Sequence, residues 1–133
     1  MFYGHPNITA RHRMTIEVTK AEDLTPRGDC IVGVRANKAC YDLPAGLKRR
    51  LRDESSVVRM SIVVDGKKCD FAAYGNPSLV LSDEHDIVIR KSGFVCPRTL
   101  AVKCDKASNS IPKDIVRILK DPATKGVLLI SVE

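Results

Sequence analysis

Three polar side chains in the first thirty residues have the types that acid–base chemistry requires. His5 and His12 lie seven residues apart, and Asp29 follows in a Gly28-Asp29 pair. An imidazole titrates near neutral pH and can exchange a proton with a substrate, and a carboxylate can orient it. His5, His12 and Asp29 are therefore the candidate catalytic residues. The alternative, which we favour, is that Gly4-His5-Pro6-Asn7 is a turn whose side chains tie the N-terminus to the fold.

A second kind of chemistry is indicated by the excess of positive charge. The chain has 22 Lys and Arg against 16 Asp and Glu, a formal net charge of +6. Clustered cations attract the phosphates of nucleic acid or of another polyanion, although a solvated helix face is commonly charged as well. With three Phe, three Tyr and no Trp, side chains for base stacking are few. The expected anion-binding residues are Arg11, Arg13, Lys38, Arg49, Arg52, Lys106, Arg117 and Lys120.

Two of these lysines belong to a repeated pair. Asn37-Lys38 and Asp105-Lys106 each follow an expected strand and precede an expected helix. Backbone amides at such a position, together with the lysine, could hold a phosphate. The favoured alternative is structural: the amide or the carboxylate caps the turn, and the lysine lies in solvent.

Other classes of site find no support. The five cysteines include no Cys-x-x-Cys pair and have no histidine at zinc-ligand spacing, so we expect no metal site. Most should be buried thiols, although one disulfide stays open as an alternative. There is no Gly-x-Ser-x-Gly elbow and no Walker-type phosphate loop. No cofactor is expected.

The elements that must position these residues occur twice in the sequence. Residues 34–53 align without a gap to residues 102–121, with seven of twenty positions identical. A repeat of this length indicates duplication of a structural unit. Upstream, residues 16–20 match residues 87–91 once a gap of three is allowed.

Each copy predicts the order β-β-α-β. In the first copy, alternation predicts strands over 14–20, 30–36 and 57–64. A leucine every fourth residue predicts a helix of about ten residues, with Asp42 as N-cap and Pro44 in the first turn. Asp65-Gly66 predicts a hairpin into a strand over 67–74. The second copy predicts strands over 86–91, 99–104 and 127–132, with a helix over 112–120 capped by Ser110.

At 133 residues the chain is expected to form one domain. Repeat one spans about 14–64, a connecting hairpin strand lies within 65–85, and repeat two spans about 86–133. One copy cannot bury both faces of its strands, so the two should close on each other. The expected class is α+β, as a pseudo-two-fold β-barrel of six to seven strands built from two β-β-α-β repeats.

Two resemblances follow. Leu24 to Val32, around Gly28-Asp29, resembles the Gly-Asp box of cradle-loop barrels, the group with double-psi, RIFT and AbrB-type folds; there the aspartate ties the amides of a sharp turn. The whole chain also resembles an archaeal family of uncharacterised proteins, a domain of unknown function. The residues that carry this second resemblance are Gly4 to Ile8, His12, Thr15 to Glu17, Leu24 to Cys30, Asp105 to Ala107 and Leu119 to Pro122. This resemblance implies an archaeal source, and the family supplies no activity that could be assigned to the chain.

These observations favour a non-catalytic binding module for an anionic partner, most readily nucleic acid. The alternative is a small enzyme for a phosphorylated or nucleotide-like metabolite that uses the His5, His12 and Asp29 region. A third reading is an interaction subunit of a larger archaeal complex. Without a signal segment or a long apolar run, a cytoplasmic protein with no membrane partner is expected. The sequence does not predict an oligomeric state.

Overall fold

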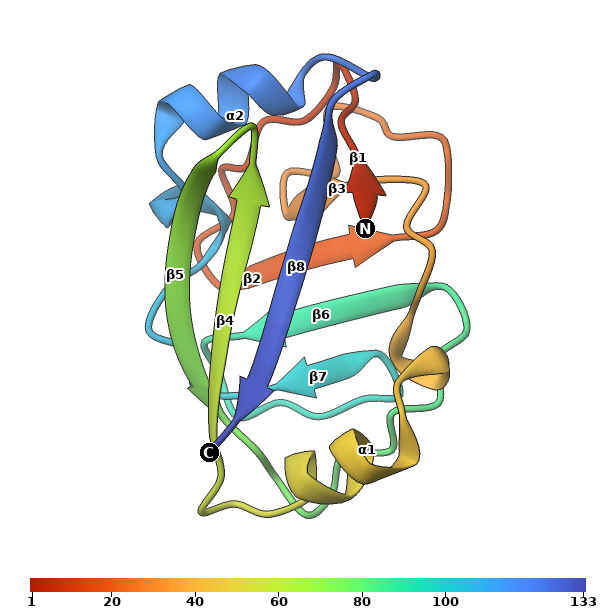
Figure 1. Ribbon diagram of the computed structural model, residues 1–133, viewed down its shortest axis with the longest axis vertical. Helices are drawn as coiled ribbons and strands as arrows, with labels where there is room; N and C mark the ends of the chain where they lie inside the picture. Colours follow the sequence, from red (N-terminus) through yellow and green to blue (C-terminus); the bar gives the residue numbers. More distant parts are fainter.

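The computed structural model describes residues 1–133 as two four-stranded sheets with one short helix at each end (Figure 1). The strands are β1 (Phe2–Tyr3), β2 (Thr15–Thr19), β3 (Ile31–Gly33), β4 (Val57–Val64), β5 (Lys67–Tyr74), β6 (Asp86–Arg90), β7 (Thr99–Ala101) and β8 (Lys125–Val132). The helices are α1 (Ala45–Leu51) and α2 (Lys113–Leu119), and 3-10 turns cover Cys40–Asp42 and Ser108–Ser110.

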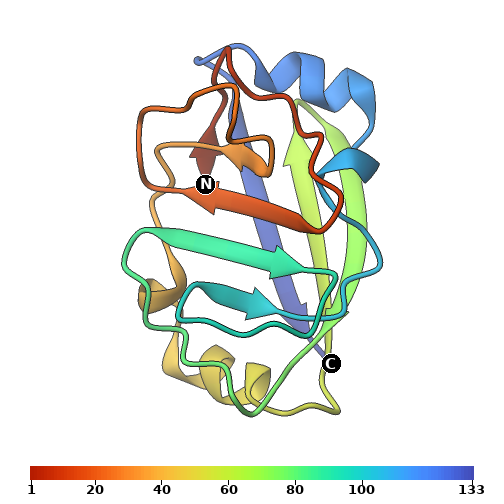
Figure 2. The same cartoon turned by 180° about the vertical axis from the view of Figure 1, so that it is seen from behind.

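The first sheet has the order β1-β8-β4-β5, and the second has the order β3-β2-β6-β7. The strands of one sheet run across those of the other, as the front and back views show (Figures 1 and 2). Single bridges, Tyr3 with Val34 and Tyr74 with Val102, join the two sheets at their edges. The α+β class is confirmed. The expectation of one closed barrel of six to seven strands is not: there are eight strands in two sheets, because only isolated bridges connect the edges.

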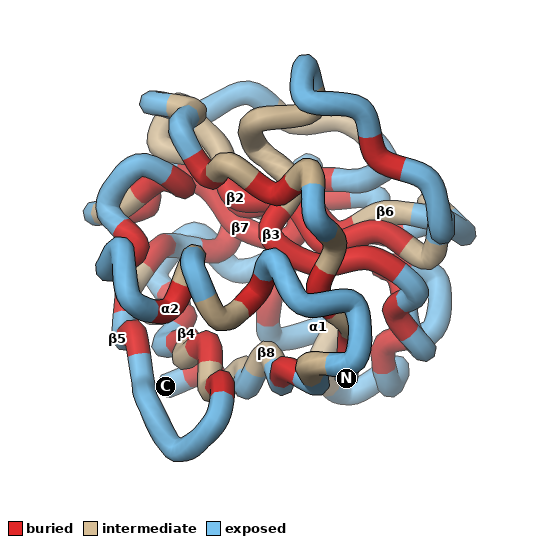
Figure 3. Tube along the Cα trace, turned by 90° about the horizontal axis from the view of Figure 1, so that it is seen from above, coloured by how far each residue is buried: buried red, intermediate tan, exposed pale blue.

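One continuous apolar core lies between the sheets, where alternate residues of each strand point inward. Ile16 and Val18 of β2 and Ile87 and Ile89 of β6 supply one side, and β4 supplies much of the other. Seen from above, buried residues occupy the centre and exposed loops surround them (Figure 3). No helix of the protein has the length and apolar character needed to cross a membrane.

The two halves repeat each other in detail. Both sheets keep their order when the halves are exchanged, with β1 and β5 in matching positions. Positive φ values recur at matching residues, at Ala10 and Leu81 and again at Arg35 and Lys103. The second copy therefore begins inside the segment 65–85, and β5 is the longer counterpart of β1. The two residues of β1 are too few to show alternation, so no sequence pattern predicts this strand.

Both helices are shorter than expected. Each spans seven residues and begins after a proline, Pro44 or Pro112, which is itself the N-cap. A proline pushes the preceding residue into an extended conformation, so the helix cannot start before it. Asp42 and Ser110 do not cap the helices. Their side chains accept the backbone N–H of Ala39 and Ala107 and so close the 3-10 turns.

Candidate functional site

The two cationic helices do not form one surface. α1 and α2 lie at opposite ends of the long axis (Figure 1), so Arg49 and Arg52 are far from Arg117 and Lys120. The anion-binding residues expected on the two helices therefore lie on two separate surfaces. The helices were equivalent in sequence, but the symmetry of the fold directs them away from each other.

A basic groove lies at the α2 end. It has a volume of about 490 Å³, and its walls are the segment Thr9–Arg11 and α2. Its lining residues are Thr9, Ala10, Arg11, Asn109, Ile111, Lys113, Val116, Arg117 and Lys120. Four of these side chains are cationic and none is a carboxylate. Three of the expected anion-binding residues, Arg11, Arg117 and Lys120, thus come together here.

The segment that forms one wall is fixed by backbone bonds. The N–H groups of Arg11 and His12 both donate to the carbonyl of Asp29, at 3.0 and 3.3 Å. The ammonium of Lys120 reaches across from the end of α2 and donates to the carbonyl of Ile8 at 2.7 Å. One cation of the groove is therefore used to hold its wall in place.

The other three cations of the groove are unpaired. Arg11, Lys113 and Arg117 make no ion pair and no side-chain hydrogen bond, and all three are exposed. The one carboxylate on α2, Asp114, pairs with Lys67 of β5 at 3.1 Å, and this hydrogen bond lowers the pKa of Asp114. The groove therefore presents three cations that have no ion-pair partner in the protein.

The matching place at the α1 end is filled. Arg52, the counterpart of Lys120, donates to the carbonyls of Leu79 and Val80, both at 2.9 Å. Tyr41 stands where the groove has Asn109. Lys48 stands where it has Val116, and its ammonium donates to the carbonyl of Tyr41 at 2.8 Å. No groove is found there. The structure thus has one basic groove, although the segments that form its walls recur in the other half of the sequence.

His5 and His12 serve turns. The Nδ1 atom of His5 accepts the N–H of Asn7 at 3.0 Å, and Oδ1 of Asn76 accepts the N–H of Ser78 at the matching place in the second half. In each turn the polar side chain therefore bonds the backbone two residues on, whichever residue supplies the acceptor.

His12 follows the same rule. Its Nδ1 accepts the N–H groups of Met14 and Thr15, at 3.1 and 3.2 Å. At the matching place, Oδ2 of Asp83 accepts the N–H groups of His85 and Asp86. Because two different acceptor residues occupy each pair of matching positions, the geometry gives both histidines the structural role.

Asp29 does not have the role that the Gly-Asp box implies. Its backbone carbonyl holds Arg11 and His12, but its carboxylate makes no hydrogen bond and so does not tie the turn amides. Neither His5, His12 nor Asp29 lines any cavity. No three residues among His, Cys, Asp and Glu lie close enough to hold a metal ion.

The repeated lysine pairs divide into structural and free groups. Oδ1 of Asn37 accepts from the N-terminal ammonium of Met1, and Oδ1 of Asp105 accepts the N–H of Ala72. These bonds join each pair to the edge of the first sheet, and neither side chain caps its own turn as the sequence favoured. The α-helix N-termini lie several residues further on, after the 3-10 turns. Lys106 donates to the carbonyl of Asp70, whereas Lys38 has no partner. Arg13 is likewise exposed and unpaired.

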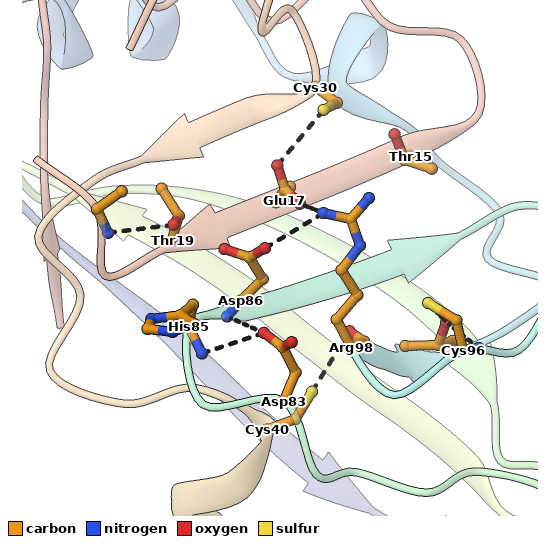
Figure 4. Close-up of polar contacts among 12 residues, drawn as sticks. Thr15, Glu17, Thr19, Cys30, Cys40, Asp83, His85, Asp86, Cys96 and Arg98 are labelled. Carbon is orange, nitrogen blue, oxygen red and sulfur yellow. Dashed lines mark hydrogen bonds and ion pairs between the residues drawn. The ribbon is translucent and has the colours of Figure 1, made fainter. Parts of the chain in front are cut away.

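A polar cluster on the outer face of the second sheet was not foreseen (Figure 4). Glu17 of β2 is only 6% exposed and pairs with Arg98 at 2.9 Å, and Arg98 also pairs with Asp86 at 3.2 Å. Burial and the nearby Asp86 raise the pKa of Glu17 against the effect of Arg98. The cluster joins the loop before β7 to β2 and β6. A glutamate within a strand is typical of a sheet face exposed to solvent. Only the loops that cover this face in the folded protein reveal that Glu17 is buried.

Cys96 has an unusual environment beside this cluster. Burial alone would raise its pKa, but hydrogen bonds from the Thr99 hydroxyl, from the Arg98 backbone N–H and from the Arg90 guanidinium lower it to about 7. Burial raises the pKa of Cys30, Cys40 and Cys104 to about 11, 12 and 11. All five cysteines are free thiols, so the alternative of a disulfide is not realised.

Two comparisons bear on this molecule. A family model with the description "Domain of unknown function (DUF371)" matches residues 1–133. An uncharacterised protein of Methanocaldococcus jannaschii is 39% identical over 118 residues, which cover 89% of this chain and 87% of that relative. The expected resemblance to an archaeal family of unknown function is confirmed.

Proposed function

This chain belongs to the DUF371 family of domains of unknown function, and from its structure we propose that it is a non-catalytic binding module for the phosphate backbone of a nucleic acid. One observation carries the proposal. The groove at α2 brings Arg11, Lys113 and Arg117 around a volume of about 490 Å³ that contains no carboxylate.

The charge of these side chains suits phosphate. A cation that already has a carboxylate partner gains little from a second anion, whereas an unpaired one can neutralise a phosphate and so release a counterion from the nucleic acid. Arg11 and Arg117 stand on opposite walls, and a guanidinium can hold two phosphate oxygens at once. An anion in the groove would therefore be held from both sides.

The shape of the groove favours backbone contacts over base contacts. It is open to solvent, and no Phe or Tyr lines it, so it offers no stacking surface for bases. Arg13 lies two residues beyond Arg11 on the same segment and extends the positive charge past the groove. Such a site reads phosphate position and little of the sequence. Arg49 and Arg52, at the other end of the molecule, are not part of it.

The enzyme alternative has no observation in its favour. It required His5, His12 and Asp29 to converge, and each instead fixes a local turn or segment through a hydrogen bond. None of the three faces the groove. We therefore propose only the binding function for this site.

The finer description of the fold is also a proposal. We infer that the two halves arose by duplication of one β-β-α-β unit, since strand order, edge bridges and positive-φ positions all recur at matching residues. The likeness to cradle-loop barrels gains support from this two-fold order. It loses support at Asp29, whose carboxylate does not tie its turn.

The test compares two variants that remove equal charge. In the first, Arg11, Lys113 and Arg117 are all changed to Gln. In the control, Arg27, Arg49 and Lys91, which are also unpaired and lie outside the groove, are changed to Gln. Binding of a duplex and of a single strand is measured by fluorescence anisotropy over a range of salt concentrations.

If the groove binds phosphates, the slope of log affinity against log salt flattens by about 2–3 units for duplex in the first variant, and far less in the control. Equal losses in the two variants would show that only net charge matters. Full competition by inorganic pyrophosphate at micromolar concentration would show instead that the ligand is a small phosphate compound.

A further inference from the structure

One edge of the first sheet is only partly paired. On the side away from β4, β8 pairs with β1 at Lys125 and Gly126 alone. The matching edge of β4 pairs with β5 over all eight residues, from Val57 to Val64. Within residues 1–133, no strand covers β8 from Val127 to Val132 on that side.

Backbone groups of β8 point out of this edge. The N–H of Glu133 donates to the carbonyl of Val57, so the odd-numbered residues of β8 bond to β4. The even-numbered residues Leu128, Ile130 and Val132 therefore direct their N–H and C=O groups outward. Only the carbonyl of Val132 has a partner there, the guanidinium of Arg50. Unpaired strand edges of this kind are templates for a further strand.

Beneath the open edge lies an apolar slot of about 80 Å³ between the two sheets. Its lining includes Val18, Leu43, Ile87, Leu128 and Ile130. Leu128 and Ile130 are half-buried, whereas their counterparts in β4, Met60 and Ile62, are 2% and 0% exposed.

The second half shows what fills the matching slot. There the side chains of Cys69 and Phe71 of β5 point inward and are buried against the core. The slot is thus the place of two alternate apolar side chains of an extended strand, and in the first half it has no such strand.

Lys38 provides a third mark of the missing strand. Its counterpart Lys106 donates to the carbonyl of Asp70, the residue between Cys69 and Phe71, from the side opposite β4. Lys38 is exposed and has no partner. Its ammonium is therefore placed to bond a carbonyl on the outer side of any strand that pairs with β8.

We propose that the open edge of β8 binds an extended peptide segment of another polypeptide by strand addition. The peptide runs antiparallel to β8 and bonds the backbone of Leu128 and Ile130. Two apolar side chains, two residues apart, enter the slot, and the carbonyl between them accepts a bond from Lys38. Outward, the peptide lies beside Leu129, which is 52% exposed, so a β-branched or apolar residue fits there.

A peptide fits this site better than β8 of a second copy does. In a second copy, the odd-numbered carbonyls of β8 are already bonded to its own β4. Lys38 would then find no free carbonyl. A peptide has both of its edges free, so it can pair with β8 on one side and with Lys38 on the other.

The test uses the protein with nothing added before Met1, because a tag at that point would itself extend into the slot. The probe is the amidated peptide Lys-Lys-Val-Thr-Phe, which follows Lys67–Phe71 of β5 with valine for cysteine and threonine for aspartate. It stops at phenylalanine because Phe2 and Tyr3 of the protein already occupy the place of Ala73 and Tyr74 beside β8. The matched control peptide is N-methylated at phenylalanine, which removes one N–H that faces β8. Binding is followed by amide chemical shifts and by fluorescence anisotropy.

We expect shift changes at Leu128, Ile130 and Lys38 that saturate with the probe, and at least tenfold weaker binding of the methylated peptide. Lys38→Met should weaken the probe several-fold, whereas Lys103→Met, at another exposed lysine, should not. Absence of saturable shifts at millimolar probe would overturn the proposal, and so would equal binding of the two peptides. If the same amides shift when the protein alone is concentrated, and its mass doubles, the occupant is a second copy.

Discussion

The two ends of the molecule are built from matching segments, yet one holds an open basic groove and the other is closed. At both ends, the basic residue that follows the helix donates to backbone carbonyls of a loop in the other half of the chain: Lys120 to Ile8, and Arg52 to Leu79 and Val80. Beyond that shared bond the ends diverge. Asn109 and Val116 leave space that Tyr41 and Lys48 occupy at the other end.

The comparison separates what the fold requires from what a site could use. Positions that do the same work in both halves, such as His5 with Asn76 and His12 with Asp83, serve the fold even when the residue type differs. Positions that differ in type and whose side chains make no hydrogen bond, such as Arg11 with Ser82 and Lys113 with Ala45, have side chains that the fold does not require. Function is best sought among the second kind.

The largest loss of stability should come from substituting Gly4, which follows β1 and lies against the end of α2, or Gly75, which follows β5 and lies against the end of α1. A Cβ on Gly75 would overlap the carbonyls of Leu51 and Asp53, and one on Gly4 would overlap those of Leu119 and Asp121. Gly75→Ala should cost about 3 kcal/mol or more of unfolding free energy. Gly4→Ala should cost less, because the two-residue β1 can fray. Urea unfolding measures the free energy of unfolding of both variants. A larger loss for Gly4→Ala than for Gly75→Ala would contradict the expected difference between the two ends.

The next effect tests His12 as a turn acceptor. His12→Ala leaves the N–H groups of Met14 and Thr15 without their partner and should cost about 1–2 kcal/mol. His12→Asp copies Asp83 and should restore most of that stability. Chemical denaturation gives both values. If His12→Asp is as unstable as His12→Ala, the two turns are not equivalent.

A smaller effect is expected from making one end resemble the other. Asn109→Tyr together with Val116→Lys should fill the groove as Tyr41 and Lys48 fill the other end. We expect about tenfold weaker nucleic-acid binding, roughly 1.4 kcal/mol, even though the net charge rises by one. Anisotropy titration measures the affinity, and Asn109→Gln is the conservative control. Tighter binding by the double variant would mean that overall charge, and not the groove, governs binding.

The smallest effect concerns Cys96, which has no counterpart cysteine in the other half. Its alkylation by iodoacetamide should have a midpoint near pH 7, with Cys30, Cys40 and Cys104 unreactive below pH 9. Because the pKa of Cys96 is lower in the folded state, its contribution to stability is full above its ordinary pKa and is lost as pH falls through 7. Cys96→Ser should remove that dependence. Mass spectrometry and unfolding at pH 6 and 9 check both, and a midpoint above pH 8 would contradict the assigned hydrogen bonds.

Local pattern was sufficient for the elements with strong periodicity. β4 and β5 have the bounds that the strand pattern and the Asp65-Gly66 hairpin predicted, and the other main strands agree within a few residues. β3 and β7 are shorter than predicted because the chain turns at Arg35 and Lys103, where φ is positive and strand geometry ends. Sequence pattern does not report such a turn when the residue is not glycine.

The candidate site was predicted only in part. Arg11, Arg117 and Lys120 were named from charge clustering, but the same rule also named Arg49 and Arg52, which lie at the far end. Clustering along the chain measures local charge density, and a groove needs segments that are distant in sequence. Lys113 and Asn109 complete the groove because the loop before β2 packs beside α2.

The sequence by itself determined the α+β class, the duplicated order of elements, the family and the excess of positive charge, since these depend on composition, on short-range periodicity and on likeness between segments. The tertiary structure decided that the strands form two sheets, that the helices point to opposite ends, that Lys120 and Arg52 brace loops, and that β8 keeps an open edge above an apolar slot. These features depend on which residues meet across the two halves. Contacts between residues a hundred positions apart arise from packing, and no local pattern encodes them.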